Sequence, residues 1–313
     1  MPADEVDVSP ELVRRLLAAQ QPDLAHLPIE VMANGWDNLL CRLGAELVVR
    51  LPRRAVAAEL ITHEQRWLPA LAPRLPLPVP APVRAGRAAL GYPWPWSVVP
   101  FLPGQVAAQD PPADPGDAAV RLGRFLGALH APAAADAPAN PNRGIPLADR
   151  KATDMQNVRA LGGLIDRRAV LRVSEAAAAT PGWHRPPVWL HGDFHPARIL
   201  VHRGRISGVI DFGDVTSGDP ATDLSVAWML LPAGCHDAFR AAYRAASGYP
   251  DSDDTWVRAQ GWALALSLAI LAHSADNPLM TEIGHRTIGA VLAWVIARVP
   301  GQVSRRSVAQ RVS

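Results

Sequence analysis

Residues 189 to 228, WLHGDFHPARILVHRGRISGVIDFGDVTSGDPATDLSVAW, contain two short apolar segments joined by an Arg-Gly-Arg turn. The segments are Ile199 to His202 and Ser207 to Ile210, and their spacing predicts a β-hairpin. Asp193 precedes the first segment and Asp211 follows the second, so the hairpin would present two carboxylates. Such a pair suits a reaction in which one group takes a proton from a hydroxyl and the other holds a divalent cation on phosphate oxygens.

The motifs around the two aspartates differ in how strongly they indicate a functional role. Taken alone, the His-Gly-Asp of residues 191 to 193 is explained equally well by a loop aspartate that caps the next turn. The second motif, Val-Ile-Asp-Phe-Gly-Asp, has its first aspartate 211 − 193 = 18 residues later, where it ends a buried β-branched run. That arrangement directs a carboxylate into a cleft. Together the motifs favour phosphoryl transfer, in which catalysis rests on positioning and on charge stabilisation.

The composition is that of a globular protein with two lobes or domains. The chain of 313 residues exceeds one ordinary core, and 49% apolar with 19% charged residues excludes a disordered tail protein. A net charge of +2 without a concentrated basic run gives no support for nucleic-acid binding. Cys41 and Cys235 indicate no disulfide framework, the N-terminal residues have no signal-peptide pattern, and the longest apolar run is about half a membrane span. We expect a cytoplasmic protein that binds neither nucleic acid nor membrane.

The N-terminal third has the pattern of a small antiparallel sheet with helices. A helix is expected to begin at Ser9 and to end before Pro22. Three β-prone segments and a helix follow, at Ile29 to Ala33, Asn38 to Leu43, Glu46 to Leu51 and Ala55 to Ala72. A proline-rich connection then leads to an edge strand, and the break at Pro103-Gly104 separates a lobe over residues 1–103 from one over residues 104–313.

Outside the hairpin, the C-terminal part has mainly helical patterns. Helices are predicted over Asp117 to Ala131, as a pair within Lys151 to Ala178, and over Cys235 to Ser247, Asp254 to Ser274 and Leu279 to Val299. The proline-interrupted segment APAAADAPANPNRG, residues 131 to 144, predicts a loop. Tryptophans within the apolar segments favour core packing over sugar stacking.

Several motifs in this order resemble the aminoglycoside phosphotransferase family, small-molecule kinases that share the protein-kinase-like fold. HGDFHPARIL, VIDFGD and GDPATDLSVAW carry the resemblance, and NGWDN, VVRLPRR, EQRWLP and GYPWPW extend it over most of residues 28 to 300. It implies an α+β bilobal fold, with a small antiparallel-sheet N-lobe and a larger, mostly helical C-lobe. The implied reaction moves the γ-phosphate of ATP or GTP, with Mg²⁺, to a hydroxyl of an aminoglycoside- or macrolide-like antibiotic or of a metabolite.

The resemblance also implies roles for individual residues. Asp193 matches the catalytic base and Asp211 the ligand of nucleotide-bound magnesium. Arg50 stands where the family often has a phosphate-contacting lysine, and Glu64 matches its ion-pair partner. Arginine stays charged and can contact phosphate or carboxylate with two N–H groups, but it is bulkier than lysine. Ordinary surface charges on a strand and a helix are the alternative interpretation of Arg50 and Glu64.

The nucleotide site is expected at two further places. Gly35 lies in a turn where related kinases fold a loop over the phosphates, although a single glycine fits a plain hairpin turn almost as well. Ser97 to Leu102 would be the hinge, with Val99 and Phe101 beside the purine. Pro100 has no N–H to donate, so its neighbours must make the base contacts. The sequence leaves ATP and GTP equally open.

Arg198 departs from the family pattern, which has Asn at this position. An amide oxygen can ligate magnesium, whereas a guanidinium has no acceptor and repels the cation. Three outcomes are open: Arg198 contacts Asp193 or Asp211 and disables the site, it contacts the γ-phosphate and supplies charge, or it points away. The first outcome makes the protein a nucleotide-binding pseudokinase rather than an enzyme, which is the alternative function.

Other polar residues of the motif stretch favour supporting roles. His191 is expected to brace the catalytic loop, and His195 could be structural or functional. Asp219 and Asp223 are predicted to cap and anchor the helix that begins near Thr222, and Asp214 is a weaker candidate for the metal.

The acceptor is open between two classes. Cationic aminoglycosides would need acids such as Asp251, Asp253, Asp254 and Glu282, although the first three also fit a helix cap, whereas a macrolide would need an apolar groove. The expected partners are a nucleoside triphosphate and a small hydroxyl compound, bound by a monomer or a homodimer.

Overall fold

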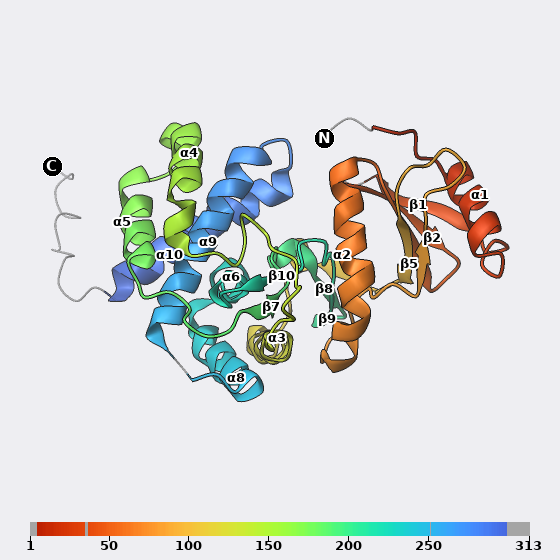
Figure 1. Ribbon diagram of the computed structural model, residues 1–313. Helices are drawn as coiled ribbons and strands as arrows, with labels where there is room; N and C mark the ends of the chain where they lie inside the picture. The colour runs from red at the N-terminus through yellow and green to blue at the C-terminus, as the bar shows by residue number, and fades with distance from the viewer. Residues whose placement is uncertain (1–4, 35–36, 251, 299–313) are drawn as a thin grey trace, which may run out of the picture.

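The computed structural model describes residues 5–34, 37–250 and 252–298. A smaller part that contains a sheet and a larger helical part lie side by side, with the hairpin of residues 199 to 209 between them (Figure 1). Gly35, the predicted phosphate-loop residue, lies outside the described residues. The α+β architecture, with an antiparallel sheet in the N-terminal part and helices in the C-terminal part, agrees with the sequence prediction.

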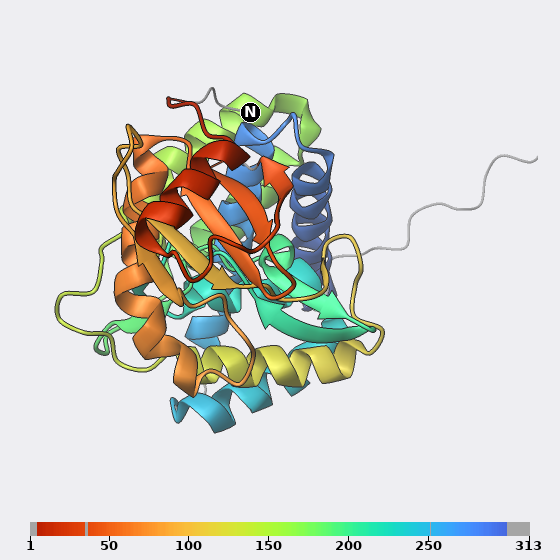
Figure 2. The ribbon, with the colours of Figure 1, turned by 90° about the vertical axis from the view of Figure 1, so that its right-hand side faces the viewer.

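The smaller part is a five-stranded antiparallel sheet in the order β1-β2-β3-β5-β4. The strands are β1 Ile29–Asn34, β2 Asn38–Leu43, β3 Leu47–Pro52, β4 Arg84–Gly86 and β5 Trp96–Pro100. Helices α1, Pro10–Gln20, and α2, Ala55–Leu71, lie on its two sides (Figures 1 and 2). The predicted strands, both helices and the edge strand after the proline-rich connection are confirmed.

Alternation along β3 sends its side chains to two different environments. Val49 and Leu51 join the core cluster that α1 covers with Leu16 and Leu17. Arg50 points to the opposite face, where it meets α2. Because successive side chains of a strand face opposite ways, a single strand thus builds a core and delivers a charged residue to the cleft side.

The larger part is organised around a buried helix, α9 Asp253–His273, which is apolar on nearly all sides. The other helices are α3 Pro115–Leu129, α4 Lys151–Leu161, α5 Arg167–Ala178, α6 Ala221–Leu224, α7 Val226–Leu230, α8 His236–Ser247 and α10 Pro278–Arg298. Helices α3 and α8 pack closely through Gly123, where an added Cβ would lie 2.6 Å from the Phe239 carbonyl oxygen. The two helices predicted between residues 151 and 178 are confirmed.

Two short ladders position the loops between the lobes. The predicted hairpin is present as β8 Ile199–His202 and β9 Arg205–Val209, and β6 Gln105–Val106 adds a strand beside β8. Strand β7 Val188–Leu190 pairs with β10 Thr216–Gly218. This pairing brings the loop after β7 and the loop before β10 together, and each loop carries one of the two aspartates. No helix of the described residues is long and apolar enough to cross a membrane.

Candidate active site

The loop that begins at His191 is fixed by groups from other parts of the chain. Gly192 has φ +85°, and a Cβ there would lie 2.3 Å from the Asp214 carbonyl oxygen, so a larger residue does not fit. The buried Asp223 carboxylate accepts hydrogen bonds from the His191 and Gly192 N–H groups at 2.7 and 3.0 Å. The interpretation of Asp223 as a helix cap is therefore wrong, because its carboxylate holds the backbone immediately before Asp193.

His191 links the two aspartate loops. Its Nδ1 accepts from the Asp193 N–H at 3.3 Å, so Nε2 carries the proton and donates to the Ile210 carbonyl at 3.0 Å. The ring also packs against Phe212, with centroids 4.5 Å apart. The predicted bracing role of His191 is confirmed.

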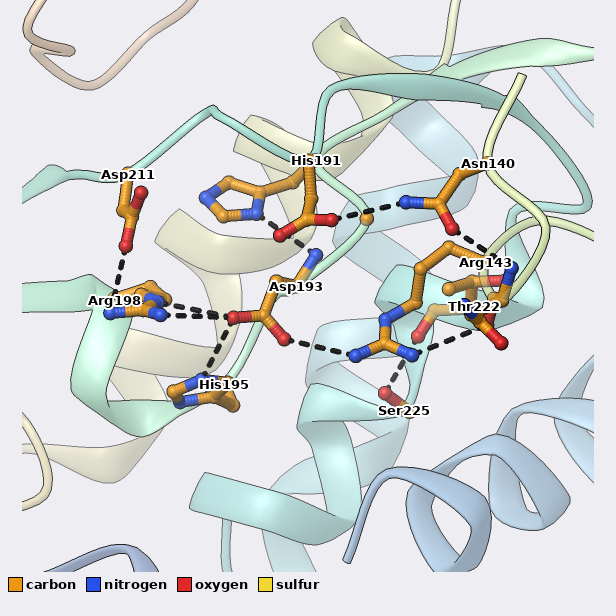
Figure 3. A network of polar contacts seen from close by, with 12 residues as sticks. Asn140, Arg143, His191, Asp193, His195, Arg198, Asp211, Thr222 and Ser225 are labelled. Atoms are coloured by element: carbon orange, nitrogen blue, oxygen red, sulfur yellow. Dashed lines mark hydrogen bonds and ion pairs between the residues drawn. The ribbon is translucent and has the colours of Figure 1, made fainter. Parts of the chain in front are cut away.

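Three cationic or N–H-bearing side chains converge on the Asp193 carboxylate (Figure 3). The Asp193 Oδ2 atom lies 3.2 Å from His195 Nε2. It also accepts from Arg198 Nε at 3.2 Å and from Arg198 Nη2 at 3.1 Å. Arg143 Nη2 lies 3.4 Å from Oδ1. Burial alone would raise the pKa of Asp193, but His195, Arg198 and Arg143 hold it well below its ordinary value. Asp193 is therefore ionised throughout the neutral range.

Arg198 bridges both aspartates, since its Nη1 lies 2.8 Å from Asp211 Oδ2. Burial alone would lower the pKa of Arg198, but Asp211 and Asp193 raise it, so the guanidinium stays charged. Burial would raise the pKa of Asp211, and Arg198 and Arg50 lower it below the ordinary value. Asp211 also has φ +66°, a strained conformation for a residue other than glycine. Of the three positions open to Arg198, the structure has the one on both carboxylates.

Arg50 and Glu64 form a buried ion pair between β3 and α2. Arg50 Nη1 lies 2.5 Å from Glu64 Oε2, and the Glu64 side chain is fully buried. Arg50 Nη2 lies 3.8 Å from Asp211 Oδ1. Burial alone would lower the pKa of Arg50, but the carboxylates of Glu64 and Asp211 raise it. Surface charge is thus the wrong interpretation of these two residues, and their predicted pairing is present.

A cavity of about 360 Å³ lies between the sheet and the hairpin. Arg50, Val99 and Phe101 line it from the sheet, and Arg198 and Asp211 line it from the hairpin side. Most of the predicted nucleotide and metal residues therefore share one cavity, which is a common form of small-molecule site.

The Phe101 backbone N–H is already used within the fold. It donates to the Glu46 carbonyl at 2.7 Å, and the Arg42 guanidinium carbon lies 3.2 Å from the centre of the Phe101 ring. A purine contact at Phe101 would therefore have to use an atom other than this N–H, or the bond to Glu46 would have to break.

A family model described as the phosphotransferase enzyme family matches residues 28–262. The chain belongs to this phosphotransferase family. The resemblance to aminoglycoside phosphotransferases predicted from the motifs is thereby confirmed. None of the curated proteins matches the sequence.

Solved structures support the fold of this phosphotransferase at low sequence identity. The GDP complex of a wild-type aminoglycoside 2'-phosphotransferase-IIIa is 20% identical with TM-score 0.66, covering 92% of this chain and 100% of that chain. A macrolide 2'-phosphotransferase from Brachybacterium faecium, solved as apoenzyme, is 23% identical with TM-score 0.59, covering 89% and 97%. A macrolide 2'-phosphotransferase type I is 20% identical with TM-score 0.58, covering 92% and 98%.

The donor set of the phosphotransferase fits one divalent cation held mainly by nucleotide phosphates. Magnesium usually takes one or two protein carboxylates together with substrate phosphates and waters. Asp211 lines the 360 Å³ cavity and can supply one such ligand. Among the described residues no group of three or more His, Cys, Asp or Glu side chains is placed to hold a metal. Arg198 stands where the resemblance implies a second oxygen ligand, and its guanidinium lies between the two carboxylates.

Two other predicted acids, Asp219 and Asp253, are engaged by arginine side chains. Asp219 does cap α6, accepting from the Ala221 N–H at 3.0 Å, and it also pairs with Arg258 at 2.6 Å. Asp253 pairs with Arg240 at 2.6 Å at the start of α9, whereas Asp251 lies outside the described residues. Asp219 and Asp253 are therefore each paired with an arginine of the helical part.

The sequence interpretation missed two residues near the phosphotransferase site, Asn140 and Arg143. Asn140 Nδ2 donates to Asp214 Oδ1 at 3.0 Å, and Arg143 reaches Asp193. Both come from the loop between α3 and α4, whose low-complexity composition predicted only a connection. The polar Asn-Pro-Asn-Arg-Gly at its end is the signal that could have identified it.

The burial of His195 predicts that the stability of the phosphotransferase depends on pH. Its Nδ1 accepts from the Ala197 N–H at 3.2 Å, so the neutral ring donates from Nε2 to Asp193. Burial lowers the pKa of His195, which the Asp193 carboxylate only partly offsets. Below an unfolded-state pKa of about 6.5, the unfolded chain takes up a proton that the folded chain does not. The free energy of unfolding should therefore fall as the pH is lowered from neutral towards the folded pKa.

Urea titrations at several pH values test this expectation. The wild type should lose more stability between about pH 7 and pH 5 than His195→Gln, which keeps a donor but does not titrate. His202→Gln is the matched control, because His202 lies on the adjacent strand and is exposed. Equal pH dependence in the wild type and in His195→Gln would contradict the assignment.

Proposed function

We propose that this phosphotransferase moves the γ-phosphate of ATP or GTP to a hydroxyl of a small molecule. The observation that carries the proposal is the pair of ionised carboxylates, Asp193 and Asp211, held on one guanidinium at the edge of the cavity between the lobes. An ordinary loop cap does not need a second carboxylate, a bridging arginine and a neighbouring cavity. Phosphoryl transfer uses two carboxylates beside a nucleotide cavity, and an arginine within reach can supply charge to the transferred phosphate.

Asp193 would orient the acceptor hydroxyl and take its proton late in an in-line transfer. The low pKa of Asp193 makes it a weak base, so orientation would be its main contribution, which suits a loose transition state with little proton transfer. Arg198 would supply positive charge near the transferred phosphate, in the manner of an arginine finger from the same chain. Its contacts with Asp193 and Asp211 would have to rearrange when nucleotide binds.

The nucleotide would lie in the 360 Å³ cavity, with its base near Val99 and Phe101 and its phosphates near Arg50. Glu64 would hold Arg50 in place, and Asp211 would ligate the magnesium ion. A bound magnesium ion would neutralise phosphate charge during transfer. Complexes of similar structures with GDP and with ADP support a purine nucleotide as donor, and both ATP and GTP belong in the tests.

The lobe boundary is placed at residues 103/104, so that the hinge belongs to the N-terminal lobe. The acceptor would enter beside Asp193, where aminoglycosides and macrolides are candidates because similar structures are named for acting on them. The protein is proposed to work in the cytoplasm as a monomer or a homodimer, and antibiotic resistance is one role that such an activity could serve.

Purified protein with magnesium and either ATP or GTP tests the proposal. Nucleoside diphosphate release should rise when a suitable hydroxyl acceptor is added from a panel of aminoglycosides, macrolides, amino alcohols and hydroxy acids. No acceptor-dependent release with either nucleotide across the panel would reject the enzyme assignment.

A nucleotide-binding pseudokinase is the second candidate, and the position of Arg198 between the two carboxylates favours it. In this view the guanidinium stays on both carboxylates when nucleotide binds, the metal contact that Asn would make is missing, and turnover is lost. The same cavity would then bind nucleotide without transferring its phosphate.

The variant Arg198→Asn separates the two candidates. Because Asn brings an acceptor oxygen in place of a positive charge, nucleotide binding should reach half-saturation at a several-fold lower magnesium concentration. Calorimetric titration of ADP at fixed magnesium levels measures this shift, and an unchanged magnesium requirement would count against Arg198 facing the ion. Loss of turnover in the variant supports a working arginine, whereas gain of turnover supports the pseudokinase. Arg205→Asn, an exposed arginine on β9, is the control.

A further inference from the structure

A buried histidine that the proposed mechanism does not use, His130, lies directly after α3. Its side chain is fully buried, and both ring nitrogens have partners: the Tyr243 hydroxyl lies 3.0 Å from Nδ1, and Asp223 Oδ2 lies 3.3 Å from Nε2. Asp223 is the carboxylate that accepts from the two backbone N–H groups before Asp193. A continuous chain of hydrogen bonds therefore runs from α8, through the end of α3, to the loop that carries the proposed base.

The partners of His130 decide which of its nitrogens carries the proton. The Asp223 carboxylate accepts hydrogen bonds, so in the neutral ring Nε2 carries the proton and donates, and Nδ1 is left as an acceptor. Burial raises the pKa of Tyr243, so its hydroxyl keeps the proton that it donates to Nδ1. Without this hydroxyl the proton can move to Nδ1, and Nε2 would then turn a lone pair towards the carboxylate. Tyr243 thus selects the tautomer that serves Asp223.

Two glycines of α3 let α8 come close enough for this contact, and the two helices lie side by side (Figure 2). A Cβ on Gly123 would lie 2.6 Å from the Phe239 carbonyl oxygen, and one on Gly127 would lie 2.9 Å from the Tyr243 carbonyl oxygen. Residues four apart lie on the same face of a helix, so the glycines of α3 meet the matching turns of α8. The Gly-x-x-x-Gly spacing therefore brings the Tyr243 hydroxyl to the end of α3.

The orientation of the Asp223 carboxylate controls the backbone before Asp193. Its Oδ2 accepts from the His191 N–H at 2.7 Å, and its Oδ1 accepts from the Gly192 N–H at 3.0 Å. A rotation of the carboxylate would shift both N–H groups together, and Asp193 is the next residue. A displacement of about 1 Å at a catalytic group can lower a rate by on the order of 10²-fold.

We propose that Tyr243 and His130 are positioning residues for phosphate transfer, and that they act through Asp223 to hold the loop that aims the Asp193 carboxylate. The inference rests on the proposed phosphotransferase function, and it assigns a part in that function to two residues that do not line the 360 Å³ cavity. The alternative is a network that only packs α3 against α8. Such a network would contribute to stability without affecting the loop selectively.

The variant Tyr243→Phe separates these alternatives, because it removes the hydroxyl and keeps the ring that packs against His130. Tyr92→Phe is the matched control. The Tyr92 hydroxyl is also buried, and it donates to the Pro52 carbonyl at 2.9 Å within the N-terminal part. Both variants lose one buried hydrogen bond, but only the first loses a bond of the chain that leads to Asp193.

Hydrogen exchange at the His191 and Gly192 backbone N–H groups, followed by NMR, measures the hold on the loop. Exchange should become about tenfold faster in Tyr243→Phe and should stay unchanged in Tyr92→Phe. Buried N–H groups of α9 serve as the internal reference, since their exchange rises equally if the whole chain opens. No change at the loop, or an equal rise in α9, would overturn the inference.

Steady-state kinetics test whether the network acts through Asp193. Tyr243→Phe should lower kcat by about tenfold and leave the KM for the nucleotide unchanged. In the Asp193→Asn background the same substitution should have little further effect, because the group that it positions is already lost. Equal losses in the two backgrounds would show a general structural defect and reject the positioning role.

Substitutions at His130 provide a rescue test. His130→Gln keeps an N–H donor for Asp223 and an oxygen that can accept from Tyr243, whereas His130→Leu keeps neither. The glutamine variant should therefore retain more turnover and slower loop exchange than the leucine variant. Equal behaviour of the two variants would count against the hydrogen-bonded chain.

The two proposals can fail separately. Loop exchange that rises selectively in Tyr243→Phe, in a protein that transfers phosphate to no acceptor, would uphold the hold on the loop and reject the enzyme assignment. Phosphate transfer that is equally fast in Tyr243→Phe and in the wild type would uphold the enzyme and reject the positioning role.

Discussion

Replacing Asp193 by asparagine should lower the turnover number by on the order of 10²- to 10⁴-fold. The amide has no negative charge to orient the acceptor hydroxyl or to take its proton late in the transfer. Its NH₂ group would also face a donor from His195, Arg198 or Arg143, all of which now contact the carboxylate. The loss should appear in kcat and not in the KM for the nucleotide, because Asp193 does not line the 360 Å³ cavity proposed to hold the nucleotide. Steady-state kinetics with the best acceptor measure the effect.

Two control measurements show whether the loss of turnover comes from a disturbed fold or from the removal of any carboxylate. Binding of ADP to Asp193→Asn should stay close to that of the wild type, which shows that the lobes still form the cavity. Asp110→Asn, at an exposed position, should keep full turnover. Full turnover by Asp193→Asn would reject Asp193 as the base.

Replacing Arg50 by methionine should lower the free energy of unfolding by about 3–5 kcal/mol. The substitution leaves the Glu64 carboxylate fully buried without its partner at 2.5 Å, and an unpaired buried charge is among the most destabilising defects. The double variant Arg50→Met with Glu64→Leu removes both charges and should regain most of the loss, because it fills the space with apolar groups. Denaturant titrations of the three proteins measure the differences.

The exposed pair of Arg14 and Glu11 provides the matched control. Its atoms are 2.6 Å apart, similar to the buried pair, but the side chains are 54% and 67% exposed. Arg14→Met should therefore change the free energy of unfolding by no more than about 1 kcal/mol. If the single and double variants at Arg50 and Glu64 are equally unstable, the cost arises from lost packing rather than from an unpaired charge.

Residues on regular elements could be predicted from the sequence. The hairpin followed from apolar segments and a turn, and it fixes Asp193 and Asp211 at its two flanks. The pairing of Arg50 with Glu64 was implied by the family resemblance and is explained by strand alternation, which turns Arg50 away from the α1 core and towards α2.

Residues whose positions depend on tertiary contacts could not be predicted. Arg143 comes from an irregular loop, and nothing in its local sequence encodes its distance to Asp193. The direction of Arg198 also stayed open, because three outcomes fitted its chemistry. The position it takes follows from two carboxylates that lie within reach of one guanidinium, and that proximity exists only in the folded chain. Asp223 was misread for the same reason, since its partners are backbone N–H groups of a distant loop.

The loop from Pro138 to Gly144 is tied down at both ends. Thr216 Oγ1 donates to the Pro138 carbonyl at 2.8 Å, and at the other end the Asp219 N–H donates to the Gly144 carbonyl at 3.0 Å. These anchors use backbone carbonyls, so they do not depend on the side chains between them. The segment 139 to 143 thus rests on end contacts that its own side chains do not make, and only Asn140 and Arg143 reach from it to Asp214 and Asp193. An engineer could keep these two residues and vary the others to graft a new choice of acceptor.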